Sequence, residues 1–116
     1  MEIKTRVLPN ATILDLTGDL TYANRAEFKA AVEGARLAGC RHLILNMEQV
    51  RFLDSSALGM LALFCQSFRH SRSKLSLLRP QAYVREIMSL ASIQKMIPLY
   101  ESEQEAVMSL NIPMAC

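Results

Sequence analysis

The chain opens with two short segments whose apolar positions suit β-strands. They are Ile3–Leu8 and Thr12–Thr17, and a Pro-Asn turn at residues 9–10 separates them. Strands joined so closely predict a β-hairpin. Gly18 and Asp19 follow at once, and we expect them to end the second strand.

A helical pattern comes next, and a compact aliphatic run follows it. From about Tyr22 to Ala38 apolar residues recur at helical spacing, and Gly39 stands where a helix commonly ends in the left-handed conformation. The run His42–Met47 shows little alternation, which is typical of a strand covered on both faces in a parallel sheet. Residues 47–53 are expected to be a linker.

The second half repeats the alternation of helix and strand. Residues 54–71, DSSALGMLALFCQSFRHS, carry apolar residues at helical spacing with more between them, so this helix should be largely buried. Residues 75–78 form a further strand. Pro80 suits the first turn of the next helix, whose inner stripe would be Val84, Ile87, Met88 and Ala91.

The last elements are short. Residues 96–100 suit an edge strand, because Pro98 has no N–H to donate to a neighbouring strand. Ser102 and Glu105 match a capping box ahead of a final helix that contains the apolar residues Val107 and Leu110. The order β-β-α-β-α-β-α-β-α predicts an α/β fold with a mostly parallel sheet, opened by an antiparallel hairpin.

Composition narrows the class of protein. A chain of 116 residues, 51% of them hydrophobic, fits one globular domain over residues 1–116. The net charge of +2 does not favour nucleic acid as a partner, and the basic residues between 69 and 74 complement the end of the long helix. The apolar stretch at 57–65 is too short for membrane insertion. The N-terminal sequence has no apolar signal core, so we expect a cytoplasmic protein.

The familiar catalytic signatures are missing from the sequence. It contains no GxGxxG, no GxxxxGK[ST] and no GxSxG motif. His42 and His70 stand alone at element ends, and we expect both to be solvated. We therefore expect no metal site, no cofactor and no enzymatic activity.

The segment FLDSSALG, at residues 52–59, joins the linker to the long helix. Either Asp54 or Ser55 suits the N-cap position, where a side-chain oxygen accepts from free amides of the first turn. Ser56 would then lie in that turn, where the amides and the helix dipole favour an anion. The simpler interpretation is a well-capped helix with no further role.

The segment VRFLDSSALGMLALF (50–64) resembles the signature of STAS-domain proteins, in particular the bacterial anti-sigma factor antagonists. The resemblance extends over nearly the whole chain, through GDL at 18–20 and the region from 84 to 110. It implies a STAS-like mixed sheet of four or five strands with about four helices, mainly on one side. It also implies that Ser56 accepts phosphate, and that Gly18, Asp19, Asp54, Ser55 and Ser56 contact a partner.

The function implied by this resemblance is partner switching by a protein that is not an enzyme. Unphosphorylated protein would bind a GHKL-type serine kinase that is also an anti-sigma factor, and a PP2C-like phosphatase would reset the switch. Thr21, Asn46 and Ala57 depart from the usual family residues, Asn46 at a strand end near the switch. The alternatives are a STAS accessory subunit of a lipid-trafficking or transport complex, which needs no phosphorylation, and, ranked last, an α/β enzyme.

Overall fold

The computed structural model describes residues 1–109 of the chain. The elements follow the predicted order, with short 3-10 turns at Tyr22–Asn24 and Ile93–Lys95. The strands are β1 (Glu2–Val7), β2 (Thr12–Leu20), β3 (His42–Leu53), β4 (Lys74–Leu78) and β5 (Leu99–Tyr100). The helices are α1 (Arg25–Leu37), α2 (Ser55–His70), α3 (Ala82–Leu90) and α4 (Glu103–Met108).

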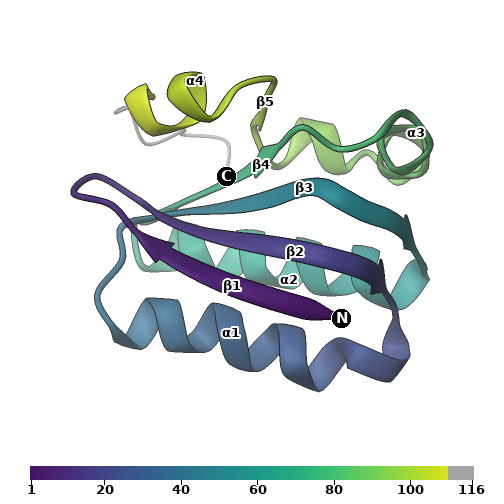
Figure 1. The fold of residues 1–116 in the computed structure, drawn as a ribbon, viewed down its shortest axis with the longest axis horizontal. Helices are drawn as coiled ribbons and strands as arrows, with labels where there is room; N and C mark the ends of the chain where they lie inside the picture. The colour runs from purple at the N-terminus through teal and green to yellow at the C-terminus, as the bar shows by residue number, and fades with distance from the viewer. Residues whose placement is uncertain (110–116) are drawn as a thin grey trace.

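The five strands form one mixed sheet in the order β1-β2-β3-β4-β5. The β1–β2 hairpin is antiparallel, and every other neighbouring pair is parallel (Figure 1). This confirms the predicted parallel sheet with an antiparallel opening. Each parallel connection passes through a helix, as strands that run in the same direction require.

Side chains of the central strands alternate between two apolar clusters of unequal size. The larger cluster joins α1, α2 and α3 to one face of the sheet through Leu14, Leu16, Leu43, Leu45, Leu75 and Leu77. The smaller cluster lies on the other face, where Ala106 of α4 packs against Ile13, Ile44 and Leu78. Three of the four helices thus cover one face, as predicted, and α4 covers part of the other.

Two strands are longer than the sequence pattern predicted. The expected break at Gly18 and Asp19 is wrong, because β2 continues to Leu20. The expected linker at 47–53 is also wrong, because β3 continues to Leu53. The pairing of β2 with β3 has register shifts between Asp15 and Thr17 and between Gly18 and Asp19. Such irregularities disturb the alternation by which a strand is recognised, although pairing continues.

The smaller deviations concern element ends. Pro80 precedes α3 instead of lying in its first turn, because Gln81 is the N-cap residue. The expected strand at 96–100 is confirmed only for Leu99–Tyr100, at the edge of the sheet. Gly39 has a φ of +90°, as expected of a helix-ending glycine. The Ser102 side chain accepts from the Glu105 amide, which confirms the predicted cap; Leu110 lies outside the described residues.

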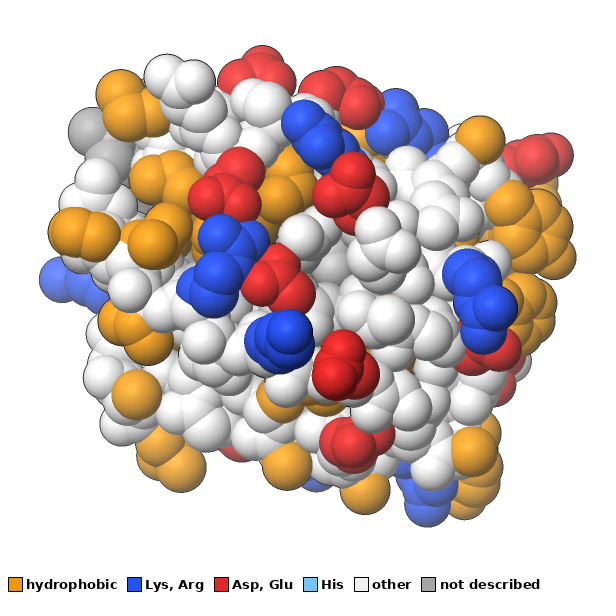
Figure 2. All heavy atoms as spheres, viewed as in Figure 1, with side chains coloured by type: hydrophobic (Ala, Val, Ile, Leu, Met, Phe, Trp, Pro, Cys, Tyr) orange, Lys and Arg blue, Asp and Glu red, His pale blue; other side chains and the backbone are white. Residues whose placement is uncertain are grey.

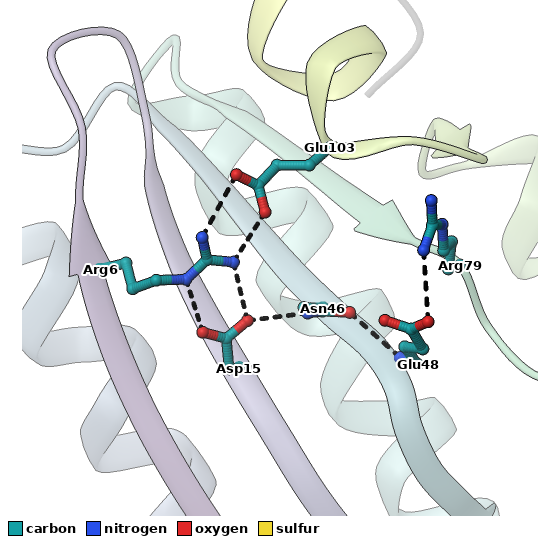
Figure 3. Close-up of polar contacts among 6 residues, drawn as sticks. All are labelled: Arg6, Asp15, Asn46, Glu48, Arg79 and Glu103. Atoms are coloured by element: carbon teal, nitrogen blue, oxygen red, sulfur yellow. Dashed lines mark hydrogen bonds and ion pairs between the residues drawn. The ribbon is translucent and has the colours of Figure 1, made fainter.

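A hydrogen-bonded polar network crosses the sheet face on which α4 lies (Figure 3). Its members are Arg6, Asp15, Asn46, Glu48, Arg79 and Glu103. Arg6 donates to Asp15 through Nε (2.6 Å) and Nη2 (2.9 Å), and to Glu103 of α4 through Nη2 (2.8 Å). Arg6 therefore links α4 to the β1–β2 hairpin.

On the side of the molecule drawn in Figure 2, acidic and basic side chains are interspersed and form no single basic patch.

Candidate functional site

The predicted site residues come together where β2 and β3 end. These strands are parallel, and Leu20 pairs with Leu53, so the segments that follow them begin side by side. The Asp54 amide also donates to the Leu20 carbonyl (3.3 Å). The structure therefore brings Gly18 and Asp19 close to Asp54 and the start of α2, although more than thirty residues separate them in the sequence.

Asp54 is the N-cap residue of α2, which decides between the two candidates that the sequence left open. Its Oδ1 accepts from the Ala57 amide (3.0 Å), as N-cap side chains typically do. Its Oδ2 accepts from the Tyr22 amide (3.0 Å), in the segment after β2. One carboxylate thus caps the helix and ties the two segments together.

The environment of Asp54 keeps its carboxyl ionised. Partial burial raises its pKa, but hydrogen bonds from the backbone amides of Ala57, Tyr22 and Ser56 outweigh burial and hold the pKa below its ordinary value. A negative charge therefore stands at the start of α2 at neutral pH. It occupies the place where a helix N-terminus most favours an anion.

Ser55 and Ser56 are the first two residues of α2, so the prediction that Ser56 lies in the first turn is confirmed. Ser55 is exposed and Ser56 is half-buried. Among residues 1–109, neither hydroxyl forms a hydrogen bond with another side chain or with the backbone. The following residue, Ala57, is buried, with 1% of its surface exposed. The helix is thereby fixed on the core while the serine hydroxyls stay free.

The end of β2 and the turn that joins it to α1 are held by hydrogen bonds of their own side chains. The Thr21 amide donates to Asn24 Oδ1 (2.9 Å), and Asn24 Nδ2 donates to the Asp19 carbonyl (2.6 Å). Gly18 has a φ of +113°, which disfavours any residue with a Cβ. The Asp19 carboxylate points to solvent and lies 3.8 Å from Arg51 Nε. These contacts give the turn a defined shape, and the bond from the Tyr22 amide to Asp54 holds it against the start of α2.

The family model of the STAS domain matches residues 2–106. The chain belongs to the STAS domain family. Among characterised relatives, this STAS domain is similar to the anti-sigma F factor antagonist of Paenibacillus polymyxa, with 21% identity over 101 residues, 86% of each chain.

Two solved structures place the fold among those of the family. A candidate anti-sigma factor antagonist from Thermotoga maritima has a TM-score of 0.86 and 22% identity, covering 93% of each chain. The Bacillus cell fate determinant SpoIIAA in its phosphorylated form has a TM-score of 0.72 and 20% identity, covering 95% of this chain and all of that one. At these identities the likeness establishes the STAS fold, with its five-stranded mixed sheet and four helices.

Exposed aromatic residues that the sequence pattern did not predict as part of the site lie near it in this STAS domain. Tyr22, Phe52 and Tyr83 are 60%, 38% and 55% exposed, whereas Phe28, Phe64 and Phe68 are buried. Phe52 and Tyr83 stack with ring centroids 6.3 Å apart. The Arg25 guanidinium lies 3.6 Å from the centre of the Tyr22 ring. Phe52 lies in the segment expected to be a linker, so its place at the end of a strand beside α3 was not predicted.

Asn46 does not lie near Ser56, contrary to the expectation. It is in the middle of β3, because that strand continues to Leu53, and its Nδ2 donates to Asp15 Oδ1 (2.7 Å) on the α4 face. Asn46, which differs from the usual family residue, is thus part of the polar network. Thr21 and Ala57, in contrast, do lie at the site, since the Ala57 amide donates to Asp54 and Thr21 precedes Tyr22, whose amide does the same.

The two histidines occupy different environments, and only one prediction was right. His70 is exposed at the end of α2. His42 is buried, with Nε2 2.7 Å from Ser76 Oγ. Burial, helped by the charge of Lys74, lowers the pKa of His42 to about 4, so it is neutral at neutral pH. Side chains alternate between the two faces of β3, and His42 points to the face on which α4 lies. Its position at the start of the strand did not predict this burial.

The environment of Lys74 also differs from the one expected for the basic residues between 69 and 74. Arg69 and His70 lie in the last turn of α2 as expected, but Lys74 is buried in β4 and donates to Tyr100 Oη (2.8 Å) and Ser109 Oγ (2.8 Å).

Within residues 1–109, no group of three or more His, Cys, Asp or Glu side chains is placed to hold a metal ion. Within the same range, no helix has the length and apolar character needed to cross a bilayer.

Proposed function

We propose that this STAS domain is a partner-switching regulator, an anti-sigma factor antagonist whose binding is controlled by phosphorylation of Ser56. Unphosphorylated protein binds a GHKL-type serine kinase that acts as the anti-sigma factor, and a PP2C-like phosphatase restores this state. The exchange takes place in the cytoplasm. The kinase supplies ATP and the chemistry, so the domain is its ligand and substrate.

The observation that carries the proposal is the position of Ser56. Its hydroxyl is free and half-buried in the first turn of α2, beside the ionised Asp54 and the braced segment at Gly18 and Asp19. A side chain so placed is accessible to an incoming phosphoryl group, while the backbone around it is held by the helix and the two strands. The docking surface of the proposal consists of Gly18, Asp19, Asp54, Ser55 and Ser56.

Phosphorylation works here through charge. A phosphoserine carries roughly −1.5 to −2 charges at neutral pH. The amides of the first turn, which otherwise suit a phosphate, already donate to Asp54. The phosphate therefore adds its charge beside a carboxylate instead of replacing it. In a desolvated interface such like charges cost several kcal/mol, and about 4 kcal/mol weakens binding roughly a thousandfold.

The test is phosphorylation of the purified protein by its partner kinase with ATP, followed by mass spectrometry and a binding titration. Phosphate is expected on Ser56, and Ser56→Ala is expected to bind the kinase constitutively. Ser55→Ala is the matched control and should still accept phosphate. Phosphate found only on Ser55 or elsewhere would overturn the assignment. Recovery of transporter subunits instead of a kinase in a pull-down would favour the accessory-subunit alternative.

A further inference from the structure

Strand β1 forms one edge of the sheet, and no described strand lies on its outer side (Figure 1). It has six residues and pairs regularly with β2 from Glu2 to Val7. At the opposite edge, β5 has only two residues. Exposed edge strands present unpaired backbone groups that can pair with another chain. Of the two edges, β1 is therefore the one long enough to receive a strand.

The hairpin shows which backbone groups of β1 face outward. The Leu8 amide donates to the Ala11 carbonyl (2.8 Å), so Leu8 directs its backbone toward β2. Alternate residues of an antiparallel strand bond to the same neighbour. The backbone N–H and C=O groups of Ile3, Thr5 and Val7 therefore point away from β2. Among residues 1–109, none of these groups has a hydrogen-bond partner.

The flank of β1 toward the helices is also uncovered. A groove of about 780 Å³ is lined by Thr5 and Val7 of β1 and by Ala30 and Gly34 of α1, among others. Val7 is 78% exposed. Because no described segment fills this groove, α1 does not shield the strand from an incoming chain.

We propose that two copies of this chain associate through their β1 strands, antiparallel about a two-fold axis at Ile3. In this register Glu2 of each copy lies opposite Lys4 of the other. Both side chains are exposed on the same face of the sheet, and opposite charges directly across two strands stabilise the pair. Ile3 lies opposite its own copy, on the face where it already packs against the main core.

The neighbouring symmetric registers each place like charges opposite one another. An axis at Lys4 places Lys4 opposite itself, with Glu2 opposite Arg6 in both halves, and an axis at Thr5 places Lys4 opposite Arg6 in both halves of the interface. Like charges directly opposite one another are destabilising. Arg6 is also held by Asp15 and Glu103 within its own chain. Charge therefore selects the register with its axis at Ile3.

The pairing uses a short strand and few side chains, so the dimer should be weak and dependent on concentration. It is independent of the proposed switch, because neither Ser56 nor Asp54 takes part. A kinase assay that failed would therefore leave this proposal standing, and a strictly monomeric protein would leave the switch standing.

Sedimentation equilibrium over a concentration series tests the proposal on the whole chain. Wild type should associate reversibly to a dimer. Glu2→Lys and Lys4→Glu should each raise the dissociation constant roughly tenfold, because two attractive pairs become repulsive. The double variant Glu2→Lys/Lys4→Glu should return it to near the wild-type value. Lys95→Glu, an exposed charge change away from β1, should leave it unchanged.

A second variant tests the backbone pairing itself. Thr5→Pro removes an outward amide, and proline is tolerated on an edge strand at such a position. The variant should stay folded, as a denaturant melt can verify, and should remain monomeric. A wild-type protein that is monomeric throughout the series would overturn the proposal. So would a double charge reversal that fails to restore association, or a folded Thr5→Pro variant that dimerises like wild type.

Discussion

Replacement of Asp54 by alanine separates a structural role of this residue from a functional one. The substitution removes the acceptors of the Ala57 and Tyr22 amides, both at 3.0 Å. Loss of an N-cap costs about 0.5–2 kcal/mol. The Tyr22 amide is exposed and can turn to water, so it adds little. We therefore expect the free energy of unfolding to fall by about 1–2 kcal/mol in total, with the melting temperature lowered by roughly 4–8 °C per kcal/mol.

Asp54→Asn is the matched control. Asparagine caps helices about as well as aspartate, so its oxygen can still accept from the Ala57 amide. The variant loses the negative charge and the second acceptor, which faces Tyr22. It should therefore be less destabilised than Asp54→Ala in a denaturant melt. Both variants should remain folded at ordinary temperatures, since domains of this size are stable by about 5–15 kcal/mol.

The decisive assay is a titration with the kinase on the same samples, with and without phosphate on Ser56. If Asp54 belongs to the docking surface, both variants should bind the kinase more weakly than their stabilities explain. If repulsion between Asp54 and the phosphate weakens the complex, phosphorylation should weaken binding less in Asp54→Asn than in wild type, by roughly tenfold or more. An equal effect of phosphate in both proteins would refute the proposed repulsion. Wild-type affinity in both variants would leave Asp54 with capping alone.

Three further predictions concern other parts of the molecule. Ser56→Asp should weaken kinase binding less than phosphate does, because a carboxylate carries a smaller charge and fewer acceptors; a titration at low salt measures this. The pKa of His42 is lowered to about 4, so its stabilising effect is full above about 6.5 and is lost as the pH falls toward 4. Denaturant melts across this range should show a loss of stability that His42→Gln reduces and His70→Gln, at an exposed site, does not. Arg6→Ala should destabilise more than Glu103→Gln, because the arginine is shared by two carboxylates; thermal melts compare them.

The sequence predicted the element order because each helix and most strands keep one period over their whole length. The stripe in α1 and the aliphatic run at the start of β3 depend only on which side chains face the core. The extension of β3 from Met47 to Leu53 was not predictable in this way. Its buried residues Met47, Val50 and Leu53 are spaced by three, which does not match a strand with period two. At each of the two register shifts against β2, the β3 strand carries one extra residue, which disturbs its period of two.

The candidate site was predictable only in part, for a related reason. The cap at Asp54 and the position of Ser56 follow from local rules about the first turn of a helix. The contact between Asp54 and the Tyr22 amide joins segments 32 residues apart. The stack of Phe52 on Tyr83 likewise needs the end of β3 to meet α3. Such contacts depend on the length and direction of strands, which local periodicity does not encode.

In the proposed switch, the geometry at the start of α2 would let a single phosphate change binding without refolding the domain. A helix N-terminus usually stabilises a phosphate through its free amides and dipole. Here Asp54 already accepts from the Ala57 amide and is ionised. A phosphate on Ser56 must share those amides with the carboxylate or displace it from them. If it shares them, two anions face the partner. If it displaces the carboxylate, the bond from the Tyr22 amide to Asp54 is weakened, and the turn after Gly18 and Asp19 is held less firmly against the start of α2. Both outcomes alter the proposed docking surface and leave the sheet and core intact, so the proposed switch needs no change of fold.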